Sequence, residues 1–213
     1  MGGGITVYLS AAYLAPLHYY ARMLAAEKVF IEQHDHYLKQ TYRNRCQIVA
    51  ANGVISLSIP VDKGDLLKCP MREIRISSHS DWQTLHWRSL VAAYNSSPFF
   101  EYYADEFISF FEKPWKYLFD FDIALQEKIL SLMEIAPSIS FTEDFRSVFD
   151  GADLDLRESI HPKKRAEDDS AYRIVPYYQV FEQRFGFVPN MSILDLLFNM
   201  GPETPLILHQ MIQ

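Results

Sequence analysis

The order of apolar runs at the start of the chain predicts a strand, a helix and a second strand. Residues 5–10 (ITVYLS) form a short apolar run, and residues 16–26 carry apolar side chains at near-helical spacing. Residues 28–32 (KVFIE) then return to a strand-like run. A strand, a helix and a strand within this length form a βαβ unit, in which the two strands are parallel. Because ligands collect beyond the carboxyl ends of parallel strands, we expect the polar residues after both strands to meet at one edge.

Two further strands are predicted on either side of the dipeptide Asn52-Gly53, which separates two β-rich runs. This dipeptide favours a hairpin turn of two residues. The side chains of residues 54–59 alternate in a way that indicates one buried face. Another strand is predicted at residues 72–77 (REIRIS).

The rest of the chain reads as mainly helical. A capping box at residues 80–83 predicts a helix to about Tyr94, and Ser97-Pro98 is a second start signal. An amphipathic helix at residues 122–135 and a last helix at residues 192–201 follow. The fold class expected from this order is α/β, as a single domain over residues 1–213. Residues 1–78 are expected to form a mixed sheet with a parallel βαβ core, and residues 79–213 a mainly helical part.

Composition narrows the class of partner. The chain has 27 acidic and 20 basic residues, a formal charge of −7, so we expect no nucleic-acid partner and only local anion sites. Two cysteines form no disulfide framework, no apolar stretch is long enough to span a membrane, and no secretion signal precedes the first strand. We therefore expect a cytoplasmic protein without membrane insertion. The sequence indicates neither a cofactor nor an oligomeric state.

The densest cluster of polar side chains lies in residues 32–45 (EQHDHYLKQTYRNR), directly after the second predicted strand. So many donors and acceptors are costly to fold inward without partners, which favours a ligand site. Lys39, Arg43 and Arg45 are candidates to bind phosphate or carboxylate, because arginine presents a planar fork and lysine a point charge. The alternative is an ion-pair cluster with Glu32 and Asp35 that only orders the loop.

Three residues of the same segment are candidates for catalysis: Glu32, His34 and His36. If the segment is extended, the two histidines share a face, where one can act as a general base. They could also bind a metal, but no third and fourth ligand is suitably spaced, so we predict no metal site.

Three other groups of residues invite a functional and a structural interpretation. Trp82 and His86 share one face of a predicted helix and could hold a sugar ring or a base, or could belong to the core. Residues 150–169, with Asp155, Arg157, His161 and Lys163, could form a lid over an anion or a solvated loop. Asp195 stands three residues after Ser192, which is a capping pattern and favours a structural role.

Four stretches carry a resemblance to a known family. They are AYLAP at residues 12–16, YLKQTYRNR at residues 37–45 with Ser58-Ile-Pro60, WQTLHW at residues 82–87, and GFVPNMSILDLLFNMG at residues 186–201. Together they resemble the WbqC-like family of bacterial proteins over nearly the whole chain. The resemblance implies a link to surface-polysaccharide and O-antigen biosynthesis.

These observations lead to one main functional hypothesis and two alternatives. The main hypothesis is an enzyme that transfers an acyl or amino-acyl group to an activated amino sugar, with a small anionic or sugar-nucleotide ligand. The first alternative is a non-catalytic sugar-nucleotide-binding or scaffold protein, and the second is a degenerate nucleotidyltransferase that uses His18. The candidate substrate-binding residues are Tyr13, Tyr37, Lys39, Gln40, Tyr42, Arg43, Asn44, Arg45, Trp82 and His86.

Overall fold

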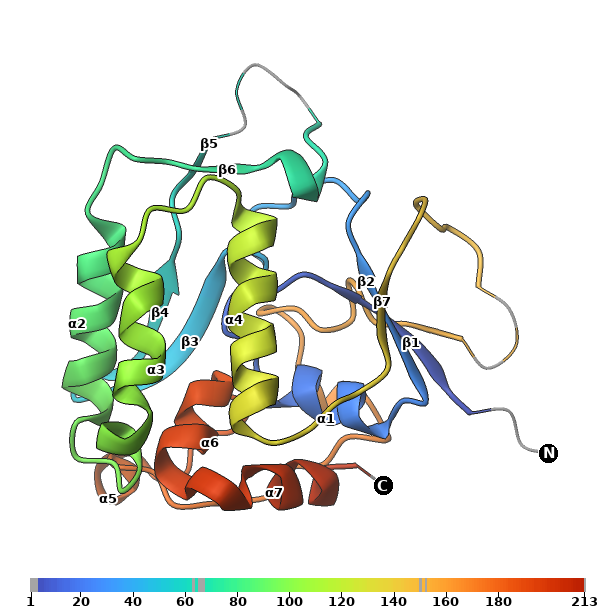
Figure 1. Ribbon diagram of the computed structural model, residues 1–213. Helices are drawn as coiled ribbons and strands as arrows, with labels where there is room; N and C mark the ends of the chain where they lie inside the picture. Colours follow the sequence, from blue (N-terminus) through green and yellow to red (C-terminus); the bar gives the residue numbers. More distant parts are fainter. Residues whose placement is uncertain (1–3, 63, 65–67, 150, 152, 213) are drawn as a thin grey trace.

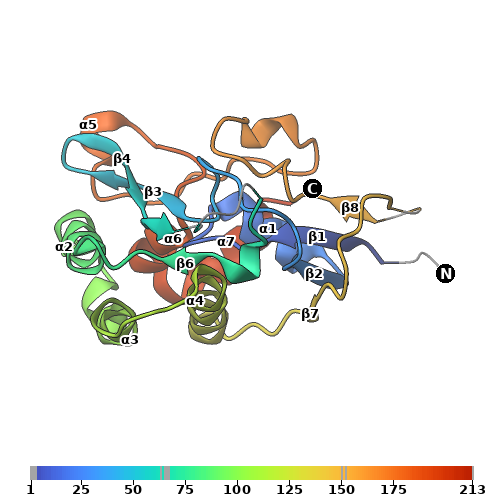
Figure 2. The same cartoon turned by 90° about the horizontal axis from the view of Figure 1, so that it is seen from above.

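A parallel sheet forms around the two strands predicted at the start of the chain. The computed structural model describes residues 4–62, 64, 68–149, 151 and 153–212. Strands β1 (Thr6–Ser10) and β2 (Lys28–Glu32) are parallel neighbours joined by helix α1 (Leu17–Ala25), which confirms the predicted βαβ unit. Strand β7 (Ile139–Phe141) pairs with β2, and β8 (Leu154–Asp155) pairs with β1, both in parallel. The resulting order, β7-β2-β1-β8, is visible at the right of Figure 2.

The predicted hairpin forms a separate antiparallel sheet. Its strands are β3 (Arg45–Ala50) and β4 (Gly53–Ser58), and Gly53 adopts a φ of 103° at the turn, a conformation that favours glycine. A second small sheet pairs β5 (Val61–Asp62) with β6 (Arg75–Ile76). The prediction of one strand over residues 72–77 was therefore wrong in extent. Its first part is the 3₁₀ helix η1 (Met71–Glu73), and only two residues pair as a strand.

Helices dominate the second half, as predicted, and the α/β fold class is confirmed. The remaining helical elements are α2 (Trp82–Tyr94), α3 (Phe100–Glu112), α4 (Leu118–Leu132), η2 (Ala166–Asp168), α5 (Glu182–Phe185), α6 (Ile193–Met200), η3 (Gly201–Glu203) and α7 (Thr204–Gln210). Buried aromatic rings connect them. The ring of Phe198 on α6 packs edge-on against Phe100 and Phe107 of α3. Within the described part of the chain, no helix has the length and apolarity needed to cross a lipid bilayer.

Several predicted helix boundaries are corrected by the structure. Helix α2 begins at Trp82, and no side chain caps it, so the capping box at Ser80 does not form. Helix α3 begins at Phe100, two residues after the predicted start signal at Ser97-Pro98. The helix predicted at residues 122–135 begins at Leu118, and α7 was not predicted. Ser192 does cap α6, because its side chain accepts a hydrogen bond from the Leu194 backbone N–H.

The two faces of the parallel sheet differ in what covers them. Val7, Leu9, Val29 and Ile31 point to one face and belong to the hydrophobic core. The alternate residues, such as Tyr8 and Phe30, point to the other face and lie outside that core cluster. In Figure 1 the helices lie to the left of the labelled strands of this sheet and below them, and loop segments lie to the right. Parallel sheets are usually covered by helices on both faces. Here loop segments cover the second face and bury Tyr8 and Glu32, and we call it the open face because, in the described part of the chain, it is covered by loops in place of helices.

Candidate functional site: the open face at the carboxyl edge of the sheet

The register of the sheet brings polar side chains from separate strands together on its open face. Ser10 ends β1 and is the direct partner of Glu32, which ends β2. Thr142 lies two residues beyond Ser140, the partner of Phe30, so it continues the same face. Arg157 lies two residues beyond Asp155, the partner of Tyr8. The carboxyl edge of the open face is therefore polar, although the other face of the same strands is apolar.

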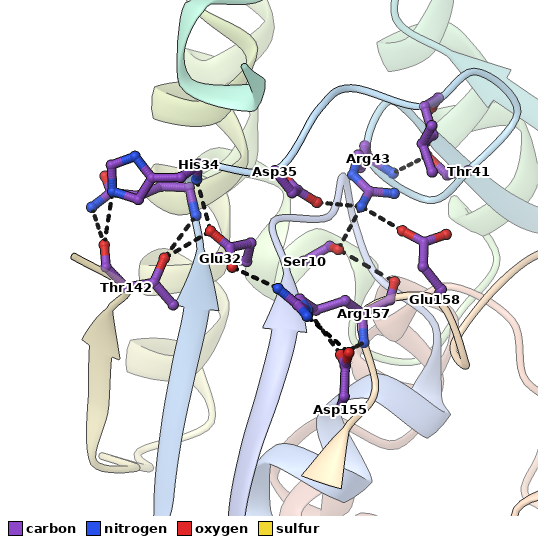
Figure 3. Close-up of polar contacts among 12 residues, drawn as sticks. Ser10, Glu32, His34, Asp35, Thr41, Arg43, Thr142, Asp155, Arg157 and Glu158 are labelled. Atoms are coloured by element: carbon purple, nitrogen blue, oxygen red, sulfur yellow. Dashed lines mark hydrogen bonds and ion pairs between the residues drawn. The ribbon is translucent and has the colours of Figure 1, made fainter. Parts of the chain in front are cut away.

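Glu32 is the centre of the first group of contacts at this edge (Figure 3). Its side chain has no solvent exposure, and its Oε2 accepts a hydrogen bond from Arg157 Nη1 at 2.7 Å. Its Oε1 accepts hydrogen bonds from the Thr142 hydroxyl and from the His34 backbone N–H, both at 2.8 Å. Arg157 also donates two hydrogen bonds of 2.8 Å to the carboxylate of Asp155. Burial raises the pKa of Asp155, but these hydrogen bonds and the charge of Arg157 outweigh burial, so the pKa is lowered overall.

Arg43 is the centre of the second group (Figure 3). Its Nη2 donates to Asp35, to Glu158 Oε1 at 2.7 Å and to the Ser10 hydroxyl at 2.9 Å. Burial raises the pKa of the Asp35 carboxyl group, even though the ion pair with Arg43 acts in the opposite direction. Among the described residues, neither Asp35 Oδ1 nor Arg43 Nε has a hydrogen-bond partner, although both atoms are buried.

The two groups together contain more acids than bases. The carboxyl groups are Glu32, Asp35, Asp155 and Glu158, and the guanidinium groups are Arg43 and Arg157. Each guanidinium is paired with two carboxylates. The edge therefore favours a ligand with hydrogen-bond donors or a positive charge over an anion.

A cavity of about 410 Å³ opens beside these residues. We call it the acidic cavity; its lining residues are Asp35, His36, Leu38, Arg43, Phe145, Ser147, Asp155, Arg157 and Glu158. The ring of Phe145 is 55% exposed, and the guanidinium of Arg157 lies 4.8 Å from its centre. Carboxylates beside an exposed aromatic ring suit a sugar, whose hydroxyl groups donate hydrogen bonds and whose C–H face packs on the ring.

Of the three candidate catalytic residues, only His36 lines the acidic cavity. Glu32 is fully enclosed by its partners, so its position is that of a residue that orients Arg157. The imidazole Nε2 of His34 lies 3.1 Å from the backbone oxygen of Thr142. The two histidines, predicted to share a face, therefore have different surroundings.

The candidate substrate-binding residues are scattered. Arg43 lines the acidic cavity, while Lys39 and Gln40 are exposed and Tyr37 and Tyr42 are buried. Asn44 donates to the backbone oxygen of Ile59 at 2.8 Å, and Arg45 donates to the Ser58 hydroxyl at 3.1 Å, so both contact the strand β4 and the residue after it. The cluster of three cations predicted to bind an anion is thus not assembled, because Arg43 alone reaches the carboxyl edge.

Tyr13, Trp82 and His86 form a contact group inside the core. The Tyr13 hydroxyl lies 2.8 Å from His86 Nδ1, and the ring of Trp82 packs edge-on against His86 at 5.1 Å. Burial lowers the pKa of His86 to about 4, so the imidazole is neutral at pH 7. The structure thus favours the core interpretation of Trp82 and His86 over the sugar-stacking one.

The segment predicted as a long loop or a lid, residues 150–169, contributes to both the sheet and the acidic cavity. It provides the strand β8 and the cavity residues Asp155, Arg157 and Glu158, while positions 150 and 152 lie outside the described residues. Lys163 and His161 do not line that cavity.

His18, the residue that the nucleotidyltransferase alternative would use, is paired with another side chain. His18 is buried, and its Nε2 pairs with the Asp169 carboxylate at 2.7 Å.

Sequence reasoning placed Ser10 at this edge, among the polar residues that follow the first strand, but it missed Thr142 and Phe145. A local signal existed for Ser10, because the alternation in YLS places it on the same face as Tyr8. No such signal existed for Thr142 and Phe145, which are positioned by the three-residue strand β7 and the loop after it.

The fold and the edge network define an α/β protein with a buried charge network at the carboxyl ends of its parallel strands. The chain belongs to the WbqC-like protein family, because the family profile matches residues 11–167 and 157–207, which confirms the resemblance. It is similar to a protein of Mycobacterium tuberculosis (strain ATCC 25618 / H37Rv) named "Uncharacterized protein Rv1507c". The identity is 27%, and the alignment covers 89% of this chain and 91% of that protein. No solved structure matches the chain.

Proposed function

We propose that this protein is an enzyme of surface-polysaccharide biosynthesis that transfers an acyl or amino-acyl group to an activated amino sugar. The sugar binds in the acidic cavity. Family membership supports the setting, since the family name is associated with polysaccharide loci. The observation that carries the proposal is the excess of carboxyl groups around the exposed ring of Phe145.

The lining of the cavity fits an amino sugar in two ways. Carboxylates accept hydrogen bonds from hydroxyl groups, and they stabilise a protonated amine in the resting complex. Glu158 is the most accessible of them, with a side chain that is 51% exposed, so it can turn toward a ligand. Phe145 supplies the apolar surface on which a sugar ring packs.

In the transfer step, the amine nitrogen of the sugar attacks the carbonyl carbon of an activated acyl donor, such as a thioester. A C–N bond forms, and the bond between the carbonyl carbon and the donor's leaving group breaks. Before the attack, His36, the general base in the cavity, takes one proton from the bound ammonium group and leaves a neutral amine. The second proton, lost as the C–N bond forms, goes to the leaving group, which departs with the bonding electron pair. Glu32 and Arg43 act as positioning residues in this scheme. Glu32 accepts a hydrogen bond from the guanidinium of Arg157, and Arg43 donates to the carboxylates of Asp35 and Glu158.

This proposal changes the role predicted for the cations. Arg43 holds Asp35 and Glu158 in place and does not bind an anion directly. Lys39 and Arg45 are left outside the proposed chemistry.

Calorimetric titration with matched sugars tests the binding part. A hexosamine with a free amine is expected to bind at least tenfold more tightly than its N-acetylated form, and the Glu158→Gln variant is expected to lose most of that preference. Glu106→Gln is the matched control, because Glu106 is a similarly exposed acid that pairs with Lys128 away from the cavity. Equal affinity for the two sugars, or an unchanged preference in Glu158→Gln, would contradict the proposal.

Turnover separates an enzyme from a binding protein. With an acyl-thioester donor, His36→Ala is expected to lower kcat by about 10²–10⁴-fold, the usual contribution of a general base, with little change in the affinity for the sugar. Tight sugar binding without any product, in the wild type and the variant alike, would favour the non-catalytic alternative.

A further inference from the structure

A second cavity, of about 510 Å³, lies on the same open face, further from the carboxyl ends of the strands. Its floor contains Tyr8 and Phe30, whose rings stack at 5.1 Å with an interplanar angle of 13°. Phe145 adds ring surface that is 55% exposed. We call it the aromatic cavity. Exposed aromatic rings at the edge of a cavity are the usual surface for stacking a planar heterocycle.

The aromatic cavity and the acidic cavity are adjacent. Phe145 lines both of them, and the Arg157 guanidinium lies over this shared ring. The junction is also fixed by the backbone, because Arg157 Nη2 donates to the Arg146 backbone oxygen at 2.8 Å. A single elongated ligand can therefore extend from one cavity into the other past Phe145.

The aromatic cavity contains both cations and carboxylates, the two kinds of charged group that bind a sugar phosphate. Lys28 and Arg146 are its cations, and Glu143 and Asp144 are its acids. The side chain of Arg146 is 54% exposed, and it donates to the Tyr8 hydroxyl at 2.7 Å and to Asp153 at a longer 3.4 Å. Arginine and lysine bind phosphate oxygens, while carboxylates accept hydrogen bonds from ribose hydroxyl groups. Both kinds of partner are present here, whereas each arginine of the acidic cavity is already paired with two carboxylates.

We propose that the aromatic cavity binds the nucleoside diphosphate part of the substrate, so that the activated amino sugar is a nucleotide-linked sugar. The base stacks on Phe145, and the diphosphate lies beside Arg146 near the junction. The sugar then extends into the acidic cavity. This inference rests on the proposed function for the sugar end, but the nucleotide end can be tested alone with ligands that carry no sugar substituent.

The test uses calorimetric titration of the full chain with UDP, CDP, GDP and ADP, none of which carries a sugar substituent. At least one of them is expected to bind the wild type. Phe145→Ala and Arg146→Ala are each expected to weaken that binding about tenfold, which corresponds to 1.4 kcal/mol. Tyr102→Ala and Arg165→Ala are the controls, because they remove an exposed ring and an exposed guanidinium elsewhere on the surface. Thermal unfolding of each variant checks that it is folded, and Arg146→Ala serves alone if Phe145→Ala is not.

The outcomes separate the inference from the proposed function. If a diphosphate binds through Phe145 and Arg146 but no amino-sugar preference exists, the inference stands and the proposed function fails. If amino sugars bind through Glu158 but none of the four diphosphates binds, or if the diphosphate affinity is the same in both variants, the inference is overturned. If the inference and the proposed function are both right, a nucleotide-linked amino sugar binds more tightly than the nucleotide or the amino sugar alone, as expected for two linked contacts.

Discussion

The carboxyl-edge network and the Asp195 cluster are both buried and charged, but they differ in how their polar atoms are paired. Asp195, in the first turn of α6, accepts hydrogen bonds from the Tyr177 hydroxyl at 2.5 Å and from Gln179 Nε2 at 2.7 Å. Gln179 in turn holds the backbone of Val188 through both its amide atoms. Hydrogen bonds among the polar atoms of this cluster connect the segment before α6 to the helix.

The edge network is different because its partners do not balance. It has four carboxyl groups for two guanidinium groups, and the buried atoms Asp35 Oδ1 and Arg43 Nε are without partners in the described part of the chain. An unpaired buried polar atom costs about 1–3 kcal/mol, a cost that a ligand bound beside it can offset. Burial and charge are common to both clusters. In our proposal, the imbalance of partners next to the acidic cavity is therefore the feature that distinguishes the functional site.

The largest effect is expected from removing the cation that compensates Glu32. In Arg157→Ala, Glu32 stays enclosed without its ion pair, so the free energy of unfolding should fall by about 3–5 kcal/mol. Urea denaturation followed by circular dichroism measures this. Arg146→Ala is the control, since its exposed guanidinium should contribute no more than about 1 kcal/mol.

A double variant tests the cause of that loss. Glu32→Gln combined with Arg157→Met removes both charges, and should recover at least half of the stability lost in Arg157→Ala. A loss below about 1 kcal/mol in the single variant would show that the edge network is not a constraint on the fold.

The second prediction concerns pH and the closed core group of Tyr13 and His86. The folded protein binds a proton at His86 only below its pKa of about 4, whereas the unfolded chain binds it below about 6.5. Lowering the pH through this window therefore favours the unfolded state. Between pH 7 and pH 4.5 the wild type should lose about 2–3 kcal/mol more stability than His86→Gln, at 1.36 kcal/mol for each pKa unit.

Asp122 makes the comparison with His86→Gln necessary. It is fully buried, burial raises its pKa, and its contribution to stability changes with pH in the opposite direction. Because both proteins keep Asp122, its contribution cancels in the difference. Parallel pH profiles for the wild type and the variant would show that His86 is not held neutral by the fold.

Much of the fold could be predicted from local patterns. The βαβ unit and the hairpin follow from apolar runs and from Asn52-Gly53, because these signals depend on neighbouring residues only. Strands β7 and β8 could not be predicted in the same way. They have three and two residues, and they are strands because β2 and β1 present open edges to pair with.

The same limit applies to the candidate site. The sequence predicted that the polar residues after the first two strands, Ser10 and Glu32 among them, meet at one edge, and it placed Arg43 in the same candidate site as Glu32. It could not place Arg157, which reaches Glu32 across 125 positions of the chain only because β8 joins the sheet. The helix-start signals at Ser80 and Ser97 failed for a related reason: packing of the rings of Trp82 and Phe100 in the core sets where those helices begin.

The smallest expected effects distinguish the edge network from the Asp195 cluster most directly. Tyr177→Phe removes one hydrogen bond to the Asp195 carboxylate, so it should cost about 1–3 kcal/mol of stability and leave amino-sugar affinity unchanged. Asp35→Asn keeps an oxygen that can accept from Arg43, so it should cost about 1 kcal/mol or less. Its amino-sugar affinity should nevertheless fall about tenfold, because a charged acceptor is lost from the acidic cavity.

Both variants are measured by urea denaturation and calorimetric titration. Tyr177→Phe is expected to lose stability and keep its affinity, whereas Asp35→Asn is expected to keep most of its stability and lose affinity. A closed cluster affects stability and not binding, whereas an unbalanced cluster beside a cavity affects binding more than stability. If Asp35→Asn instead lost stability and kept its affinity, the edge network would be a structural cluster like that of Asp195. The unpartnered atoms of Asp35 and Arg43 would then be a cost of bringing four strand ends together, and the ligand would have to be sought in the aromatic cavity alone.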